Sequence, residues 1–465
     1  MNALLGIAVS ATAVLLNFDV SDKERNIERR IKVDPSQRIE INGFSGSKIN
    51  FTSWDSSVVY VKVRVRIESS DRDYEEAWIE SVKLTESQTT TSLILNFEEP
   101  ERSWSNGGFW SKLFGSNYIR KEISGEIFVP RSNALRANIP YGTVNLDGMK
   151  GELQFRGQSN TLTLRNCANI LDVDNNYGKT TIENSGGNLR LESQSGTLTI
   201  SDFNGTIEAN INYTNSTLSR IKKAVTLNSQ SAKHRFEDIQ GDLTVNANYS
   251  NIIATNIAGF VDVQSQSGTV KIKNVKGVSV DANYSTIEVS DVSGEAKKDI
   301  FVKGQSGRIV IENATGNVTV DDRYSNITLK KIRGSVELSS QSARISGEEI
   351  AGSWSSHTQY STITLRGLSA QTISMTNSSN PIDIELKIVP TKIEIKNQYG
   401  GVKATMPKGY SGDITLEATY GNVESDLPIR VKSLGSGSYG IGKVGSGSGS
   451  IMIETQSGNI RLYER

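Results

Sequence analysis

Residues 176–214 read NYGKTTIENSGGNLRLESQSGTLTISDFNGTIEANINYT, and two short phrases in this stretch recur along most of the chain. One phrase is Asn-Tyr followed by Gly or Ser, and the other is Gln-Ser-Gly. The central Tyr or Ser returns every 18 residues from Tyr141 to Ser267, and the alternation continues to Ser378 with one deletion and one four-residue insertion. So regular a period is typical of a solenoid in which each repeat forms one coil.

Apolar residues occupy two pairs of positions in each repeat. They lie three and five residues after the central residue, as at Leu198 and Ile200, and again twelve and fourteen residues after it, as at Leu189 and Leu191. Alternation with a period of two predicts a strand with one inward face. Between the two strands stands an Asx residue with Gly three positions later, as in 202–205 (DFNG), which predicts a β-turn.

The sequence therefore predicts an all-β protein, a single-stranded parallel β-helix with about 18 residues per coil and an N-terminal β-rich cap domain. Eighteen coils at the spacing of paired strands would extend over roughly 85 Å. The expected organisation is a signal peptide at 1–18, a cap domain at 19–125 with an aromatic loop at 98–117, and a solenoid of about 18 coils at 126–465.

The alternating Tyr and Ser have two interpretations. If this position points inward at a corner, a large ring above a small hydroxyl lets adjacent coils pack densely, and we expect this arrangement. The Asn or Gln before it would then form an amide ladder along one edge. The alternative is an exposed strip that binds a glycan, formed by Tyr177, Tyr213, Tyr249, Tyr284, Tyr324 and Tyr360.

The first 18 residues are mostly apolar, and no Lys or Arg precedes the apolar run. The length suits the core of a signal peptide and is short for a membrane-spanning helix. We therefore expect an exported chain, located in the periplasm, on the outer surface or outside the cell, with no integral membrane span once the leader is removed.

The periodicity differs from about residue 26 to residue 97, where alternating strands flank a single convincing helix. The helix is expected over Asp71 to Val82, with Ser70 as its cap. We expect this region to cover the first coil, because an uncovered strand edge would pair with other chains.

Several segments resemble a known group of proteins. These are 39–43 (IEING), 53–55 (SWD), 126–130 (EIFVP) and the repeated Tyr-Gly-Thr-Val or Ser-Gly-Thr-Leu units. They are similar to bacterial β-strand-repeat proteins of unknown function that are described as candidate adhesins. The resemblance implies a secreted or envelope-associated β-helix with a binding role, and it brings no catalytic residues with it.

The loop at 98–117 is rich in Gly and Ser but carries several large apolar side chains. It is either a flap packed over the solenoid or an exposed patch for a protein partner, a glycan or a membrane interface. The candidate binding residues are Trp104, Phe109, Trp110, Leu113 and Phe114.

The charges balance, with 51 Lys and Arg against 51 Asp and Glu. A nucleic-acid partner would need a basic face, so none is expected. Pectin-degrading enzymes also use parallel β-helices, and the candidate catalytic carboxylates here are Asp172 with Asp174, and Asp321 with Asp322 beside Arg323. We interpret all of them as solvated outward positions and predict no catalytic residues.

Metal ligands are sparse. His234 falls in an inward strand position beside Phe236, whereas His357 falls in an outward position. The single cysteine, Cys167, occupies an inward turn position and is expected to be a small core residue. No metal site and no cofactor are predicted.

The expected function is non-enzymatic: an exported β-solenoid that acts as an adhesin-like or scaffolding surface module at the bacterial cell envelope, with a glycan or an envelope protein as partner. The alternatives are a polysaccharide-active β-helix enzyme and a periplasmic partner of an envelope-sensing regulator. The sequence predicts no oligomeric state.

Overall fold

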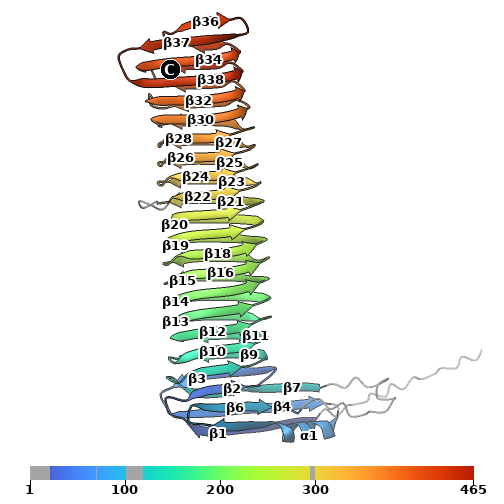
Figure 1. Ribbon diagram of the computed structural model, residues 1–465. Helices are drawn as coiled ribbons and strands as arrows, with labels where there is room; N and C mark the ends of the chain where they lie inside the picture. The colour runs from blue at the N-terminus through green and yellow to red at the C-terminus, as the bar shows by residue number, and fades with distance from the viewer. Residues whose placement is uncertain (1–20, 70, 101–118, 294–298) are drawn as a thin grey trace, which may run out of the picture. The chain divides into compact units, whose positions relative to one another are not determined.

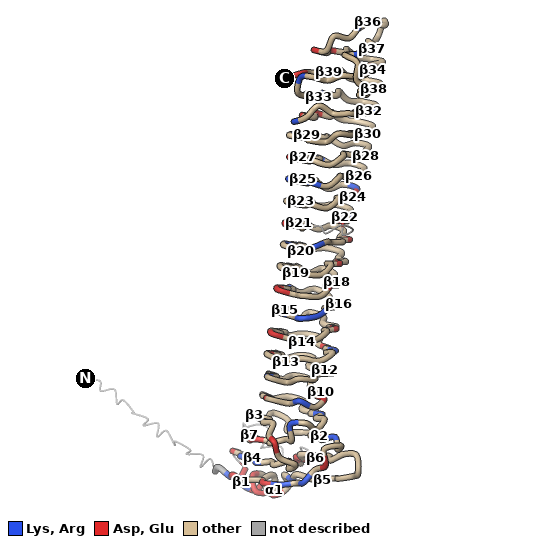
Figure 2. The backbone as a smooth tube through the Cα atoms, turned by 90° about the vertical axis from the view of Figure 1, so that its left-hand side faces the viewer, with Lys and Arg blue, Asp and Glu red and all other residues tan. Residues whose placement is uncertain are grey.

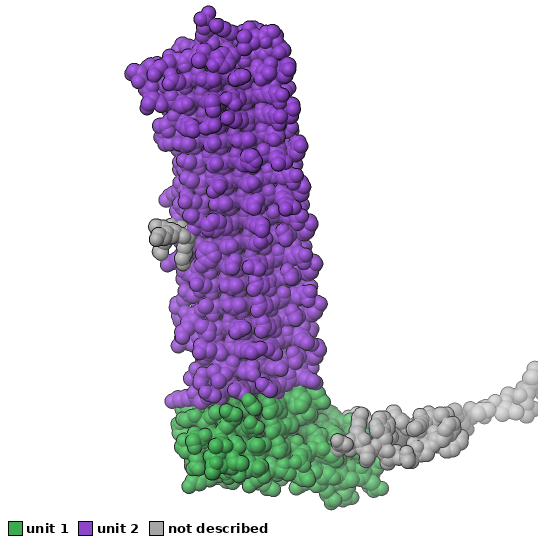
Figure 3. All heavy atoms as spheres, viewed as in Figure 1, with its two compact units in different colours: residues 1–146 green, residues 147–465 purple. Residues whose placement is uncertain are grey.

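The computed structural model describes residues 21–69, 71–100, 119–293 and 299–465, which are almost entirely β-strand (Figure 1). The chain divides into two compact units, residues 1–146 and 147–465 (Figure 3). The predicted parallel β-solenoid is confirmed, with about 15 turns at a spacing of about 18 residues.

Unit 1 contains two groups of paired strands. The first has the order β1–β4–β7–β3, in which β7 and β3 are parallel and the other neighbours are antiparallel. The second has the order β5–β6–β2–β8, in which only β5 and β6 are antiparallel. The bounds are β1 Ser21–Lys32, β2 Arg38–Asn42, β3 Ser47–Trp54, β4 Val58–Ser69, β5 Lys83–Gln88, β6 Ser92–Glu98, β7 Ile119–Pro130, β8 Leu135–Asn138 and β9 Tyr141–Asp147.

The expected helix is present as α1, Arg72–Ser81, but its cap differs from the prediction. Asp71 is the N-cap, and its carboxylate accepts a hydrogen bond from the Tyr74 amide at 3.1 Å. An Asx side chain at this position satisfies one of the free amides of the first turn. The helix buries Trp78 and Ile79.

In unit 2 the strands form two rows, and strands of successive coils pair in parallel. One row contains β11 Ser159–Arg165, β15 Thr214–Ile221, β17 Lys233–Ile239, β21 Ser285–Val292, β23 Arg308–Ala314, β25 Asn326–Ile332, β27 Arg344–Ile350, β29 Thr362–Leu368, β31 Ile382–Leu386, β33 Val402–Met406, β35 Val423–Ser425 and β39 Ile460–Glu464.

The other row contains β10 Glu152–Gly157, β12 Asn169–Asn175, β16 Val225–Gln230, β18 Leu243–Asn248, β22 Ile300–Gly304, β24 Val318–Asp322, β26 Val336–Ser340, β28 Trp354–Thr358, β30 Thr372–Ser379, β32 Lys392–Tyr399, β34 Gly412–Tyr420 and β38 Gly449–Ser457. Four longer strands bend around a corner and contribute to both rows: β13 Lys179–Ser193, β14 Gly196–Asn212, β19 Ser250–Ser265 and β20 Gly268–Ala282.

The core of unit 2 is filled by the apolar positions that the repeat predicts. Leu189, Leu191, Leu198 and Ile200 are all buried, and most of the same positions are buried in the other coils. Because paired strands place equivalent residues directly above one another, each inward position forms a column that is mainly apolar.

The corner between the two strands differs from the β-turn that we predicted. The Asx residue adopts a left-handed conformation, with φ of 54° at Asp202 and 58° at Asn256, so a single residue turns the chain. Asn and Asp tolerate this conformation better than other non-glycine residues. The side chains also form a ladder, since Asn256 Nδ2 donates to Asp238 Oδ1 at 2.9 Å and Asn274 Nδ2 donates to Asn256 Oδ1 at 2.7 Å.

Glycine at the fourth corner position is explained by the close approach of successive coils. A Cβ atom built on Gly205 would overlap the carbonyl oxygen of Gly187 in the preceding coil. Strand spacing fixes this distance, so the backbone has no room to move away. The equivalent residue of the next coil is Lys223, whose side chain is exposed.

The C-terminal coils do not stack in chain order. Strand β38 lies between β32 and β34 (Figure 1), and β39 pairs with β33 and with β35. The chain therefore leaves a space for one coil after β33, builds the β34–β35 coil beyond it, and returns to fill the space with its last coil.

A hairpin precedes the last coil, over residues 430–444. Strands β36 Arg430–Leu434 and β37 Gly437–Val444 are antiparallel, and β37 also pairs with β34. Tyr439 belongs to this hairpin and does not mark a coil, which is one reason why the turns number about 15 and not the predicted 18 or so.

We predict that Gly205→Ala lowers the free energy of unfolding by roughly 1–3 kcal/mol, because the added methyl group must displace backbone from a paired coil. Denaturant titration followed by circular dichroism measures the change. Lys223→Ala, at the same corner position one coil later, is the matched control and should change stability by less than about 0.5 kcal/mol. Equal effects of the two substitutions would contradict the explanation.

Candidate binding surface

The repeat tyrosines point outward, so the expectation that they fill the core is wrong. Tyr177, for example, has 58 % of its surface exposed. The inward corner position is taken by the next residue, a small hydroxyl side chain such as Thr214 or Ser250. These hydroxyls donate to the backbone oxygens of Asn212 and Asn248 at 3.0 and 2.9 Å, which satisfies them inside the corner.

The exposed tyrosines occupy alternate coils of unit 2. Since paired strands are about 4.8 Å apart, tyrosines two coils apart are separated by about 9.5 Å. The tyrosine row, as we name it, consists of Tyr177, Tyr213, Tyr249, Tyr284, Tyr324, Tyr360, Tyr399 and Tyr420, each more than half exposed.

The last two members of the row are explained only by the stacking order. Tyr399 and Tyr420 follow one another along the chain with no serine marker between them. In space, Ser457 of β38 is the strand partner of both residues. The inserted coil therefore restores the alternation of ring and hydroxyl that the sequence order obscures.

Glutamines of the following coils hold at least two of the rings. The Tyr177 hydroxyl donates to Gln194 Oε1 at 2.6 Å, and the Tyr324 hydroxyl donates to Gln341 Oε1 at 2.8 Å. The amide ladder that we predicted at this glutamine position is therefore wrong for these coils.

An amide ladder lies two residues earlier in the repeat. Asn228 Nδ2 donates to Asn210 Oδ1 at 2.9 Å, and Asn246 Nδ2 donates to Asn228 Oδ1 at 3.0 Å. These outward side chains lie on the ends of strands that lead into the tyrosine corner.

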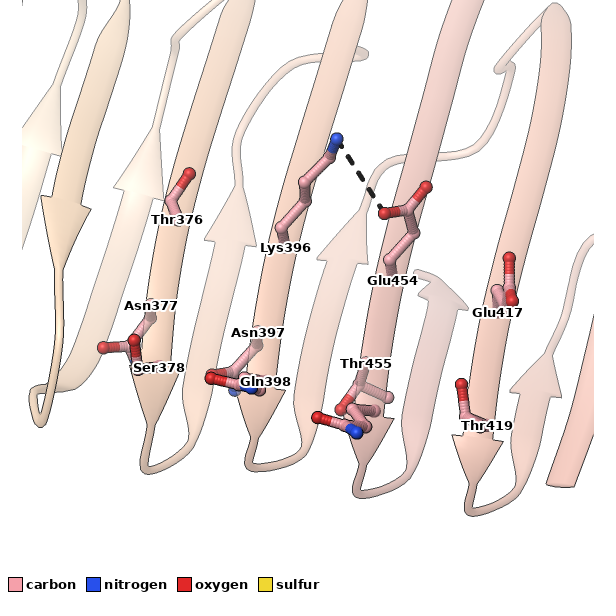
Figure 4. Close-up of a pocket in the computed structure, with 11 residues that line it drawn as sticks. Thr376, Asn377, Ser378, Lys396, Asn397, Gln398, Glu417, Thr419, Glu454 and Thr455 are labelled. Carbon is pink, nitrogen blue, oxygen red and sulfur yellow. Dashed lines mark ion pairs between the residues drawn. The ribbon is translucent and has the colours of Figure 1, made fainter. Parts of the chain in front are cut away.

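Two grooves run beside the tyrosine row, on the strand ends just before the corner. One has a volume of about 430 Å³ and a polar lining, and it is formed by Asn246, Asn248, Gln264, Ser265, Gln266, Asp281 and Asn283. The other has a volume of about 370 Å³, and its lining includes Thr376, Ser378, Gln398, Thr419 and Gln456 (Figure 4). The two grooves use the same positions of the repeat, several coils apart.

The second groove also carries charge. Lys396, Glu454 and Glu417 project from the neighbouring strands β32, β38 and β34, and Lys396 Nζ lies 3.9 Å from Glu454 Oε2 (Figure 4). The groove therefore offers carboxylate and ammonium groups as well as amides and hydroxyls.

Charged residues of both signs are interspersed along the solenoid, and the tube in Figure 2 shows no continuous basic stripe. Several of them form ion pairs between coils. Arg220 Nε lies 2.6 Å from Asp202 Oδ1, and Lys271 Nζ lies 2.8 Å from Glu288 Oε2. The Arg220 guanidinium lowers the pKa of the Asp202 carboxyl by hydrogen bonding.

The candidate catalytic carboxylates lie in different surroundings. Asp322 is buried, which corrects the outward position that we predicted, and it accepts hydrogen bonds from the Ser325 amide and hydroxyl at 2.6 Å. Asp321 is exposed on the opposite face of the strand. Asp174 is half-buried. Its burial is the main cause of a raised carboxyl pKa, and the nearby Glu192 carboxylate raises this pKa further.

The two remaining core predictions are confirmed. Cys167 is fully buried, and burial raises the pKa of its thiol to about 11, which disfavours the reactive thiolate. His234 is buried beside Phe236 with its Nδ1 2.8 Å from Ser216 Oγ, and its Nε2 has no hydrogen-bond partner. His357 is exposed, as expected.

Among residues 21–69, 71–100, 119–293 and 299–465, no group of three or more His, Cys, Asp or Glu is placed to hold a metal ion. No helix of that part of the chain is long and apolar enough to cross a membrane. Trp104, Phe109, Trp110, Leu113 and Phe114, and the leader at 1–18, lie outside the described residues.

Residues 278–463 match the family described as Toastrack DUF4097. The match covers less than half of the chain, and it bears out the expected likeness to a repeat family of unknown function. No curated protein matches the sequence.

One solved structure, described as a "putative cell adhesion protein" from Clostridium sporogenes, matches at 11 % identity and covers 95 % of this chain and 100 % of its own. Its TM-score is 0.14, so the name of that protein is not carried over to this chain.

The buried His234 predicts a pH dependence. Burial lowers its pKa from 6.5 to about 4, so the unfolded chain binds a proton between these values and the folded chain does not. The contribution of His234 to the free energy of unfolding should therefore be fully present above pH 6.5. It should fall as the pH decreases, by about 2 kcal/mol at pH 5 relative to pH 7.5.

Denaturant titration of the wild type and His234→Leu across this range measures the effect. The variant should lose the histidine contribution to the pH dependence, whereas His357→Gln, at the exposed histidine, should retain it. Parallel pH profiles for wild type and His234→Leu would contradict the assignment.

Proposed function

We propose that the chain is a non-enzymatic, exported β-solenoid that acts as an adhesin-like or scaffolding surface module at the bacterial cell envelope, and that its tyrosine row with the adjoining grooves binds an extended glycan. The observation that carries the proposal is the tyrosine row itself, eight exposed rings on alternate coils. A row of exposed aromatic side chains in register is typical of an interaction surface.

The chemistry of the surface favours a carbohydrate. A tyrosine ring offers an apolar face for the C–H side of a sugar ring, and its hydroxyl remains available for hydrogen bonding. The neighbouring Asn and Gln side chains each present both donors and acceptors, which is what sugar hydroxyls require. Rings restrained by Gln194 and Gln341 lose less conformational freedom on binding.

The geometry favours a polymer over a small ligand. The row repeats every two coils at about 9.5 Å, so a chain with its own repeat can contact several tyrosines at once. Each contact can be weak, because sites on one rigid support reinforce one another through their effective concentration.

Structural contacts account for Asp322, one of the carboxylates that an enzyme would need. Asp322 holds the Ser325 corner, and Asp321 faces the other side of the strand. The outward charges of the solenoid pair with one another between coils, which supports a partner other than a nucleic acid.

We predict that the triple substitution Tyr213→Ala, Tyr249→Ala and Tyr284→Ala weakens binding to an insoluble or gel-immobilised polysaccharide by about ten-fold or more, since each lost contact reduces the multivalent attraction. A polysaccharide panel tested by pull-down or affinity electrophoresis identifies the ligand and measures the loss.

The control for this experiment is the double substitution Ile253→Ala and Phe301→Ala, which removes exposed apolar side chains outside the tyrosine row. It should leave binding unchanged. Substitution of the same three tyrosines by Phe keeps the rings and should retain most of the affinity. Equal losses in the tyrosine and control variants would contradict a role for the row.

Export is a separate prediction, supported by the apolar run at 1–18. Protease treatment of intact cells, with fractionation and antibody detection of the chain, should cleave the solenoid from outside. Protection in intact cells followed by release with the periplasm would contradict a surface location and favour an envelope partner. Recovery in the cytoplasm would overturn export itself.

A further inference from the structure

The last coil, 449–464, is held in unit 2 by noncovalent contacts on both of its faces. Strand β38 pairs in parallel with β32 on one side and β34 on the other, and β39 pairs in the same way with β33 and β35. Ile451, Ile453, Ile460 and Leu462 are buried in the core columns. This coil therefore completes an apolar and hydrogen-bonding slot that the rest of the chain forms around it.

We propose that this slot also accepts the last coil of a second copy of the chain, so that two molecules join by exchanging residues 449–465. All of the contacts that hold the coil are made again in the exchanged pair, because the same residues fill the same slot. Only the path of the linker between β37 and β38 changes, so forming a dimer by exchange requires little free energy.

The connection suits such an exchange. Residues 445–448 read GSGS, and they link the β36–β37 hairpin to β38. Gly/Ser segments behave as flexible chains, and four residues span about 13 Å when extended. Gly447 of the linker and Gly449 at the start of β38 donate their amides to Ser411 Oγ and Ser411 O at 2.7 and 3.2 Å, so both of these hydrogen bonds go to one residue.

The order of folding favours the same outcome. The slot exists only once the β34–β35 coil has formed, with a gap of one coil between it and the β32–β33 coil. The residues that fill this gap follow all of the residues that form it. Until it enters, the slot presents unpaired strand edges on both sides, which a second copy can pair with.

The far end of the coil supplies a specific lock. Arg465 donates its backbone amide to Met406 O at 3.0 Å and its Nη2 to Leu386 O at 3.0 Å, and its guanidinium pairs with Glu385. These contacts require an arginine directly after β39, so the favoured occupant is an identical coil and not an arbitrary strand.

Disulfide trapping between two chains tests the exchange. Met452 of β38 is the outward strand partner of Glu394 of β32, so cysteines at these positions are placed to bond across adjacent strands. One chain carries Glu394→Cys and the other Met452→Cys, both with Cys167→Ala, since Ala314 fills the equivalent corner position. The two full-length chains are mixed, unfolded, refolded together and oxidised.

The matched control joins Ser374→Cys with Glu394→Cys in separate chains. Ser374 of β30 is also an outward strand partner of Glu394, but both lie in coils that follow one another along the chain. The Glu394→Cys, Met452→Cys double variant should close an intramolecular disulfide, which shows that the cysteines reach each other in the folded chain.

The exchange predicts roughly ten-fold more intermolecular disulfide from the Glu394→Cys and Met452→Cys mixture than from the control mixture. Equal yields from the two mixtures, with the double variant closing normally, would overturn the proposal. The result does not depend on the tyrosine row, so failure of glycan binding and failure of exchange are distinguishable.

Discussion

Parallel backbone hydrogen bonding between successive coils is the constraint on which the rest of unit 2 depends. It sets the distance between coils at about 4.8 Å and places each residue directly above its counterpart 18 residues earlier. Every position of the repeat therefore becomes a row along the solenoid. Inward rows form the apolar columns, and outward rows become surfaces with one chemical character.

The corners satisfy this constraint in two different ways. At the Asx corner the chain turns on one left-handed residue, and glycine follows where backbones approach most closely, as at Gly205. At the tyrosine corner a small hydroxyl residue such as Ser250 fills the inside and donates to the backbone oxygen of Asn248. The large side chain before it is then directed to solvent. The binding surface is thus a consequence of how the corner is packed.

The inserted last coil shows that chain order and stacking order are separable. Any coil with the right register can form the parallel hydrogen bonds, whichever part of the sequence it comes from. Ser457 enters between Tyr399 and Tyr420, so the pattern of alternating rings continues to the end of the solenoid. The alternation is a property of the assembled stack, and at this end it is produced by residues that are far apart in the sequence.

The sequence by itself determined the coil length, the two strands of each coil and the inward columns, because periodicity reports directly on which residues share a face. It also placed Cys167 and His234 in the core. The direction of the repeat tyrosines, the left-handed Asx corner and the position of the last coil were decided by the tertiary structure. A corner has no alternation to show which residue points inward, and the choice depends on which side chain fits the space between two coils. A local sequence pattern does not predict the stacking order either, because the strands of every coil present nearly the same backbone edge.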